Sequence, residues 1–509
     1  MIRAMTSPRA VAGLSAIAAA TLFAGVAQAQ VAPVMSCDAS GIGSVKLKAD
    51  KAPKILEAVA AIAGKDATAV PYCLVKVLVP DAVNIWVTLP MDGKWNGKLQ
   101  SIGGGGYAGT VAAPTAPVLG GYVGVATDTG HSGVDGAFGM KSPGVANKPL
   151  WVDFAYRSEH LMAVVGKQLA QAFYGKGPQF SYWNGCSTGG RQGLMMAQRF
   201  PDDYNGILAG APAIHWDRFQ AAQMWPQVAM LRENGGPVPS DKLMAASAAA
   251  VASCDAQDHV KDGVLEDPRT CRFDAKTMMC GAGVRDDKCF TSGEAAAVNK
   301  IWEGPKGHWY GMTPGTPLQL LAGSQPFMIA FNQSRYWVYL DPEWDWTQLT
   351  YDNYDKFFKD TVRAVGPVLA TDNPNLNAFR KRGGKIVLWH GWNDPLIMPE
   401  GTIDYYEKVV KRDGKLEKTQ QFARLFMAPG VGHCAGGTGP QPQGLFDSVV
   451  KWVEKGEAPD SIVASKLAGE VGTRTRPLCP YPAVATYKGS GSTDDAANFR
   501  CEVPSVAQR

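Results

Sequence analysis

The chain has 509 residues, of which 46% are hydrophobic and 19% are charged, and this composition excludes a disordered or low-complexity protein. The formal net charge of +4, from 50 basic and 46 acidic residues, is too balanced for a nucleic-acid-binding protein, so we expect no nucleic-acid partner. A typical domain size of roughly 150 residues predicts two to three domains.

Residues 1–29 have the pattern of a secretory signal peptide. Arg3 and Arg9 give a basic start, residues 11–24 are apolar and rich in alanine, and Ala27-Gln28-Ala29 is a small-x-small cleavage site. The apolar stretch is too short and too rich in alanine for a membrane span. We therefore predict a secreted or periplasmic protein that is cleaved near Ala29 and has no membrane-inserted segment.

The ten cysteines of an exported chain favour disulfide bonds, because an oxidising compartment keeps thiols paired. A zinc site is the competing interpretation, but the chain contains no C-x-x-C pair. Pairing of sequence neighbours uses eight cysteines and leaves Cys186 and Cys434 for each other. The predicted bridges are Cys37–Cys73, Cys186–Cys434, Cys254–Cys271, Cys280–Cys289 and Cys479–Cys501.

Strands and helices alternate in the first part of the mature chain, residues 30–213. Apolar stretches that end at Pro, Gly or Asp predict strands, and apolar residues at helical spacing predict helices. The predicted elements are strands over 72–79, 84–89, 99–102, 121–127 and 180–183, and helices over 159–174 and 194–200. This alternation predicts an α/β domain with a mostly parallel sheet.

The alternation breaks over residues 214–380, an irregular segment that contains four cysteines and many aromatic residues. It then resumes with strands over 385–390 and 424–427 and helices over 402–411 and 446–455. The simplest organisation is one α/β domain, formed by residues 30–213 and 381–509, that is interrupted by an insertion over 214–380.

A candidate nucleophile lies between the strand over 180–183 and the helix that follows it. Gly185-Cys186-Ser187-Thr188-Gly189 fits G-x-S-x-G, the pattern of a tight turn that raises a serine above the edge of a sheet. The N-terminus of the following helix would direct its N–H groups at a developing negative charge. Because Gly and Ser are common residues, the strand-turn-helix context carries the assignment of Ser187.

A serine nucleophile needs a base and an acid, which this pattern presents in the chain order Ser, acid, His. His433 is the candidate base because it lies in a glycine-rich loop after a late strand, whereas His390 ends a strand and is expected to be structural. Asp394 follows that strand and is the candidate acid, although an Asp-Pro turn alone would be the plainer interpretation. A Cys186–Cys434 bridge would join the serine and histidine loops.

Together these segments resemble the tannase and feruloyl esterase family, which includes the hydrolase of mono(2-hydroxyethyl) terephthalate. The segments that carry the resemblance are Gly185-Cys186-Ser187-Thr188-Gly189-Gly190-Arg191-Gln192-Gly193, Trp392-Asn393-Asp394 and Gly432-His433-Cys434. The similarity continues over nearly the whole mature chain. It implies an α/β-hydrolase fold with a large lid inserted after the nucleophile helix, and residues 214–380 match that lid.

The resemblance also implies the roles of individual residues. It implies a catalytic triad of Ser187, Asp394 and His433. It implies an oxyanion hole made by the backbone N–H groups of Gly106 and Thr188. Leu396 and Ile397 are expected to border the pocket for the acyl group of the substrate.

A calcium ion is the one cofactor that the resemblance implies, and no organic cofactor is expected. The candidate ligands lie in the insertion and are Asp255, Asp258, Val260, Asp262 and Val264. Carboxylates and backbone carbonyls suit a hard cation. From the residues alone, a solvated acidic turn would be the favoured interpretation, and the family resemblance reverses that preference.

We therefore predict a secreted serine esterase that acts on small aromatic carboxylic esters, with a feruloyl ester as first choice. Tannase and terephthalate half-ester hydrolase stay open as alternatives, the latter weakened because Thr188 replaces a Glu associated with that enzyme. An alternative from another class is a non-catalytic aryl- or carbohydrate-binding protein on a hydrolase scaffold. Five tryptophans of the insertion are expected to pack its own core, and some of them to wall a flat aryl pocket: Trp302, Trp309, Trp337, Trp344 and Trp346.

Overall fold

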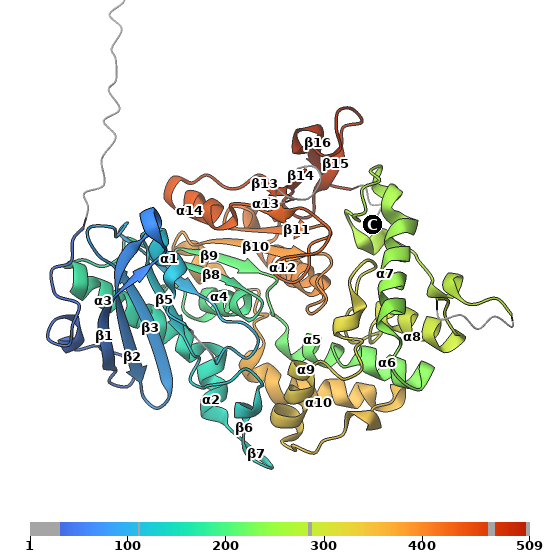
Figure 1. Cartoon of the computed structure of the whole chain (residues 1–509), viewed down its shortest axis with the longest axis horizontal. Helices are drawn as coiled ribbons and strands as arrows, with labels where there is room; N and C mark the ends of the chain where they lie inside the picture. Colours follow the sequence, from blue (N-terminus) through green and yellow to red (C-terminus); the bar gives the residue numbers. More distant parts are fainter. Residues whose placement is uncertain (1–30, 110–111, 283–287, 467–473, 505–509) are drawn as a thin grey trace, which may run out of the picture.

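The computed structural model describes residues 31–109, 112–282, 288–466 and 474–504, so the predicted signal peptide lies outside the described residues. Its centre is a nine-stranded sheet with the strand order β1-β2-β3-β5-β4-β8-β9-β10-β11 (Figure 1). The strands are β1 (Lys54–Ala63), β2 (Val70–Val79), β3 (Val83–Pro90), β4 (Lys98–Ile102), β5 (Val123–Thr127), β8 (Phe180–Cys186), β9 (Gly206–Gly210), β10 (Lys385–Gly391) and β11 (Ala423–Ala428).

The sheet is antiparallel at its N-terminal edge and parallel over the rest of its width. Strands β1, β2 and β3 pair antiparallel, and β3 pairs antiparallel with β5. From β5 to β11 every neighbouring pair is parallel. The prediction of a mostly parallel sheet is confirmed, and its physical basis is visible in β5 and β9, whose residues are all buried.

Two of these strands have no counterpart among the predicted elements. Strand β1 is an exposed edge whose alanine-rich sequence has no clear period-two pattern. Strand β9 is only five residues long and begins and ends with glycine, so it shows little strand propensity. Both strands form because their neighbours supply hydrogen-bonding partners.

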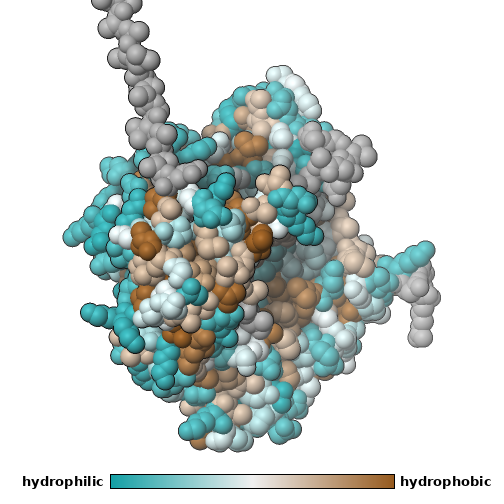
Figure 2. All heavy atoms as spheres, turned by 60° about the vertical axis from the view of Figure 1, so that its left-hand side comes forward, coloured by the Kyte–Doolittle hydropathy of each residue, from teal (hydrophilic) through white to brown (hydrophobic). Residues whose placement is uncertain are grey.

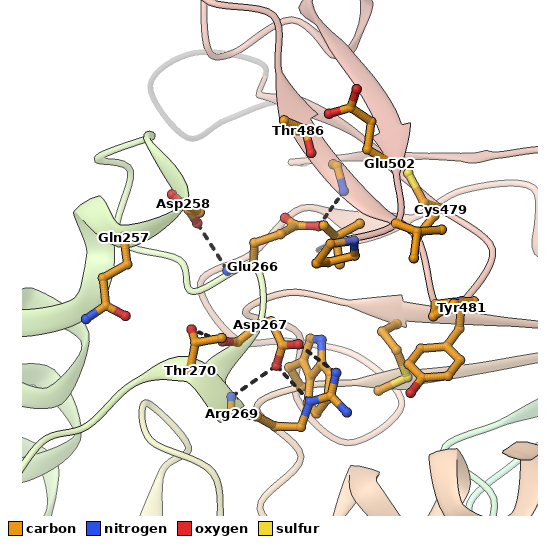
Figure 3. A pocket seen from close by; sticks show the side chains of 18 of the residues that line it. Gln257, Asp258, Glu266, Asp267, Arg269, Thr270, Cys479, Tyr481, Thr486 and Glu502 are labelled. Carbon is orange, nitrogen blue, oxygen red and sulfur yellow. Dashed lines mark hydrogen bonds and ion pairs between the residues drawn. The ribbon is translucent and has the colours of Figure 1, made fainter. Parts of the chain in front are cut away.

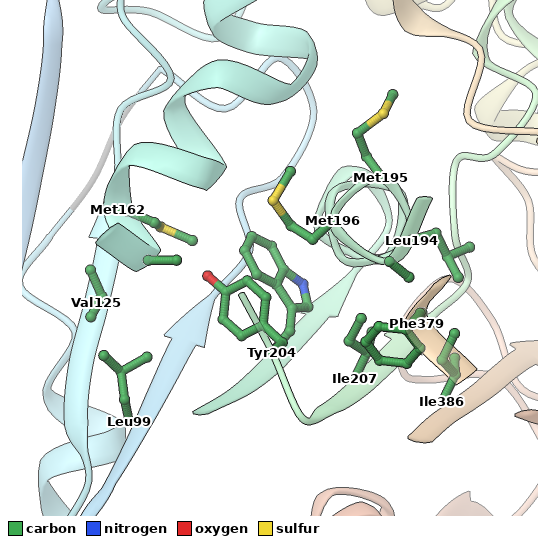
Figure 4. Close-up of a cluster of buried hydrophobic side chains, with 14 of the residues drawn as sticks. Leu99, Val125, Met162, Leu194, Met195, Met196, Tyr204, Ile207, Phe379 and Ile386 are labelled. Carbon is green, nitrogen blue, oxygen red and sulfur yellow. The ribbon is translucent and has the colours of Figure 1, made fainter. Parts of the chain in front are cut away.

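Helices cover both faces of the sheet. The helices α3 (Ser158–Tyr174), α4 (Thr188–Arg199) and α12 (Pro399–Asp413) pack on one face, where their apolar side chains join one buried cluster with the strands. Figure 4 shows part of this cluster, with Met162 of α3 and Leu194 of α4 together with strand residues such as Leu99 and Val125. Helix α14 (Leu445–Lys455) packs on the opposite face with a second cluster. The side chains of Tyr182 and Trp183 point to opposite clusters, as the alternation along β8 requires.

Helix α4 begins at Thr188, six residues earlier than the predicted helix over 194–200. Its first turns contain several glycines, which in a sequence indicate a turn rather than a helix. In the structure these glycines are required by close packing. A Cβ on Gly190 would lie 2.5 Å from the carbonyl oxygen of Gly210, and one on Gly193 would lie 2.6 Å from the ring of Trp183. The missing side chains therefore let α4 approach the sheet closely.

The chain leaves the sheet after β9 and returns at β10, its parallel neighbour, after a long insertion. Most helices of this insertion lie together at the lower right of Figure 1, whereas the last one, α11 (Asn377–Lys381), packs against α4. The helices before α11 are α5 (Trp216–Ala222), α6 (Trp225–Asn234), α7 (Ser240–Cys254), α8 (Ser292–Glu303), α9 (Met328–Gln333) and α10 (Tyr351–Leu369). One of its apolar clusters lies wholly within the insertion, and a second includes side chains from residues 107–155, 213 and 397–398, so the insertion packs against the α/β part.

The described chain also contains shorter α-helices and strands. They are α1 (Thr115–Leu119), α2 (Lys148–Val152), α13 (Leu416–Thr419), β6 (Met140–Ser142), β7 (Val145–Ala146), β12 (Gln441–Pro442), β13 (Ile462–Ser465), β14 (Thr475–Leu478), β15 (Val484–Tyr487) and β16 (Phe499–Glu502). Strands β12, β13 and β14 form a small sheet, and β15 and β16 form a hairpin.

Five disulfide bonds join segments of the chain, and they are the five predicted pairs. The described helices include none that is both long and apolar enough for a membrane span. On the face turned forward in Figure 2, hydrophobic residues form separate patches among polar ones. Leu56, Val59 and Ile62 of the edge strand β1 are among the exposed apolar side chains of the molecule.

Candidate active site

Ser187 occupies a sharp turn between β8 and α4, as the motif predicts. Its backbone has φ 63° and ψ −125°, a conformation that non-glycine residues adopt only when their surroundings impose it. A Cβ on Gly185 would lie 2.5 Å from the backbone of Gly189, and a Cβ on Gly103 would lie equally close to Gly189. The glycines of the motif are thus needed because three backbone segments meet here.

His433 and Asp394 form a hydrogen-bonded pair. The Nδ1 atom of His433 lies 2.7 Å from Oδ2 of Asp394, whose side chain is fully buried. The other carboxylate oxygen, Oδ1, accepts hydrogen bonds from the backbone N–H groups of Leu396 and Ile397. Although burial opposes the charged form, the charge of His433 and hydrogen bonds from His390 and His433 hold the pKa of Asp394 well below its usual range.

A second imidazole contacts the same carboxylate. The Nε2 atom of His390 lies 2.9 Å from Oδ2 of Asp394. The expectation that His390 is merely structural is therefore incomplete, because its ring touches the candidate acid. The available signal in the sequence is its position at the end of β10, four residues before Asp394.

The disulfide between Cys186 and Cys434 brings the serine and histidine loops together. It links residues 248 positions apart and holds their Cα atoms at 5.9 Å. Ser187 and His433, each next to one of these cysteines, line the same cavity of about 460 Å³. Asp404, another carboxylate that follows β10, lies instead beside His215 at 3.3 Å.

The two predicted oxyanion-hole residues border this cavity together. Thr188 is the first residue of α4, so its N–H has no acceptor within the helix. Its hydroxyl donates a 2.5 Å hydrogen bond to the carbonyl oxygen of Gly106 and ties the two segments together. The side-chain oxygen of Gln192 accepts from the N–H of Gly104 at 2.9 Å, which fixes the glycine-rich loop to α4.

The walls of the cavity are largely apolar and aromatic. Leu396 and Ile397 line it, together with a group of residues from the insertion. That group comprises Trp216, Phe219, Gln220, Gln223, Phe327 and Ile329. The expectation that some of the five tryptophans between 302 and 346 wall the pocket is wrong, since all five are described and none lines the cavity. Trp337 and Trp344 instead pack in the apolar clusters of the insertion.

The predicted calcium loop lies in the insertion, beside a separate and larger cavity of about 980 Å³ (Figure 3). Burial, together with the charges of Asp262 and Asp255, raises the pKa of Asp258 to about 6. Asp262 is held by an ion pair with Arg476, and Oδ1 of Asp255 accepts from two backbone N–H groups. In the described parts of the chain, no three acidic, His or Cys side chains converge as a metal site. Calcium binding stays a prediction.

The chain matches a family model described as tannase and feruloyl esterase over residues 68–319 and 321–502. It is 37% identical over 471 residues to a probable feruloyl esterase of Arthroderma benhamiae, covering 86% of this chain and 87% of the relative. Identity to a probable feruloyl esterase B-2 of Aspergillus terreus is 33% over 444 residues, covering 80% and 81% of the two chains. The crystal structure of feruloyl esterase B from Aspergillus oryzae has a TM-score of 0.80 at 26% identity, covering 90% of this chain and 98% of that one.

A tannin acyl hydrolase from Aspergillus niger shares the fold, with a TM-score of 0.79 at 22% identity over 92% of this chain and 96% of that one. The agreement therefore spans sequence and architecture over most of the chain. It includes the sheet, the insertion and the segment that carries Ser187. The chain belongs to the tannase and feruloyl esterase family and is a carboxylic ester hydrolase with an α/β-hydrolase fold.

Proposed function

We propose that this hydrolase cleaves aromatic carboxylic esters through a Ser187–His433–Asp394 triad. The observation that carries the proposal is the single cavity shared by Ser187 and His433, whose imidazole is bound at Nδ1 by buried Asp394. With Nδ1 donating to the carboxylate, Nε2 is the nitrogen left to accept a proton. This is the tautomer that a general base next to a serine requires.

The reaction proceeds in two acyl transfers. The Oγ atom of Ser187 attacks the ester carbonyl carbon while His433 takes the hydroxyl proton. The tetrahedral intermediate then expels the alcohol, which receives that proton from His433, and leaves an acyl group on Ser187. A water molecule repeats the sequence, giving its proton to His433 and releasing the carboxylic acid and free Ser187.

The negative charge on the substrate oxygen is stabilised by the backbone N–H groups of Gly106 and Thr188. Both residues border the cavity beside Ser187, and the hydroxyl of Thr188 holds the carbonyl oxygen of Gly106. Donors fixed before the reaction stabilise the transition state without reorganisation, and each is typically worth about 3 kcal/mol.

The substrate is a small ester with a flat aryl acyl group, and a feruloyl ester is the first choice. Trp216, Phe219 and Phe327 give the cavity aromatic walls, which favour a planar ring over a flexible lipid chain. The names of the relatives, which are feruloyl esterases and a tannin acyl hydrolase, support the same class. Galloyl and terephthaloyl esters are the alternatives within that class.

Export to the periplasm or medium is part of the proposal. Five disulfides are expected in a protein that folds in an oxidising compartment. The basic and apolar pattern of residues 1–29 provides the corresponding signal peptide. A structural calcium ion bound by the loop over 255–264 completes the proposal, and it takes no part in the chemistry.

The test is a kcat/KM panel on methyl ferulate, methyl gallate, mono(2-hydroxyethyl) terephthalate and a nitrophenyl alkanoate, since these ratios report differential binding of transition states. We expect the ferulate ester to be the best substrate and Ser187→Ala to abolish its turnover. Ser44→Ala, an exposed serine outside the cavity, is the matched control and keeps wild-type rates. A preference for the alkanoate contradicts the aryl pocket. Binding of ferulate without turnover of any ester would favour the non-catalytic alternative.

A further inference from the structure

Two imidazoles share one oxygen of the candidate acid. Oδ2 of Asp394 lies 2.7 Å from Nδ1 of His433 and 2.9 Å from Nε2 of His390. The side chains of Asp394 and His390 are both fully buried. His433 faces the substrate cavity, whereas His390 is not among the residues that line it. His433 can therefore reach a bound substrate, whereas His390 contacts only the acid behind it.

We propose that His390 is a positioning residue of the triad, which holds the Asp394 carboxylate in the orientation that binds His433. The inference rests on the proposed serine-esterase function. His390 does not touch the substrate or the reacting atoms, so it acts only through Asp394.

The protonation pattern of the His390 ring follows from its partners. Nε2 lies 2.9 Å from Oδ2 of Asp394 and 3.2 Å from the carbonyl oxygen of Ile397, and both oxygens only accept hydrogen bonds. Nε2 therefore carries a proton. Nδ1 lies 2.8 Å from the hydroxyl of Thr402, a buried residue of α12, and in the neutral ring this nitrogen accepts from that hydroxyl. The oxygens of Asp394 and Ile397 thus select the tautomer that donates to Asp394, and Thr402 holds the ring in place.

Both oxygens of the Asp394 carboxylate have hydrogen-bond donors other than His433. Two backbone N–H groups, from Leu396 and Ile397, hold Oδ1 at 2.8 and 3.0 Å. Only His390 and His433 donate side-chain hydrogen bonds to Oδ2 among the described residues. Rotation about the Cβ–Cγ bond of an aspartate is soft. Without His390, His433 is the one side chain left to hold Oδ2 among the described residues, while the N–H groups of Leu396 and Ile397 still hold Oδ1.

His390 also affects the charge that His433 experiences. The titratable groups in contact with Asp394 are His390 from β10 and His433 from the loop after β11. A hydrogen bond from His390 draws part of the carboxylate charge toward its own N–H. Removing that donor leaves more negative charge for His433, which favours the imidazolium form and moves the acid limb of the rate profile to higher pH.

The test compares three variants in the mature, disulfide-bonded protein, with active sites counted by the acyl-enzyme burst. His390→Leu removes the N–H, His390→Gln supplies an amide N–H near the former Nε2, and Thr402→Val removes the hydroxyl that orients the ring. We expect His390→Leu to lower kcat by about 10- to 100-fold with little change in KM, a typical effect of losing a supporting hydrogen bond. In the same variant, the fall of kcat/KM at low pH is expected to begin at a higher pH than in the wild type.

The other variants distinguish positioning from a merely structural role. His390→Gln is expected to recover most of kcat and the wild-type acid limb, and Thr402→Val to show a smaller loss in the same direction. His160→Leu, which removes a histidine paired with Asp203 outside the cavity, is the control and leaves the profile unchanged. If His390→Leu does not fold, the Gln and Thr402→Val variants carry the test.

An unmoved acid limb with unchanged kcat per active site overturns the inference when it is found in folded His390→Leu or, if that variant does not fold, in Thr402→Val. Loss of kcat that His390→Gln does not recover, with the acid limb unmoved, overturns it as well, because that result indicates packing alone. The proposed function fails in a different way, through absence of wild-type turnover or retention of turnover in Ser187→Ala.

Discussion

Replacing both Cys186 and Cys434 by alanine is expected to weaken the fold and the chemistry together. The bridge closes a loop with a sequence separation of 248 residues. In the loop-entropy description, a cross-link of this length stabilises the folded state by about 5 kcal/mol. An unfolding entropy of about 2.1 cal/mol/K per residue over roughly 480 mature residues converts that value to a fall in Tm of about 5 °C. Thermal unfolding under non-reducing conditions measures it.

The matched control is Cys37→Ala with Cys73→Ala, which opens a loop with a separation of 36 residues outside the cavity. The same relation gives a loss of about 4 kcal/mol and a similar fall in Tm. Only the first variant releases the loops of Ser187 and His433, so only that one should lose kcat per folded molecule. A misplacement of about 1 Å costs roughly 100-fold. Wild-type kcat in the Cys186 and Cys434 variant, at a temperature where it is folded, would refute the clamp.

Three further outcomes are expected. Asp394→Asn should lower kcat by about 10⁴-fold because the amide imposes the wrong imidazole tautomer, and near-normal steady-state turnover would place the acid elsewhere. Although burial opposes its charged form, ion pairs with Asp372 and Asp404 raise the pKa of His215 above 6.5. The stabilisation from this pairing is complete below pH 6.5 and is lost as the pH rises through the raised pKa. As the pH rises above 6.5 through the raised pKa, the Tm of the wild type should therefore fall more than the Tm of His215→Asn. Equal dependence of Tm on pH in the two proteins would contradict the pairing. Chelation by EDTA should lower Tm more than kcat if the loop over 255–264 binds calcium, and an unchanged Tm with no metal by elemental analysis would favour a solvated turn.

Local features of the sequence are enough to predict the parts of the site that depend on neighbouring residues. The nucleophile turn at Ser187 needs small residues within a few positions, so its motif is visible in the chain itself. The bridge between Cys186 and Cys434 follows from the cysteines that remain once sequence neighbours are paired. Because these two cysteines adjoin Ser187 and His433, the sequence alone links the two loops of the site.

The tertiary structure decided the contacts between residues whose positions in the sequence carry no mutual signal. The glycines of α4 indicate a turn by composition, but Gly210 and Trp183 require them for close packing. The tryptophan in the cavity wall is Trp216 of α5 rather than one of the tryptophans after residue 300. The contact of His390 with Asp394 likewise depends on how β10 and the loop after it fold back. Sequence patterns determine the local backbone, whereas long-range packing determines which side chains meet.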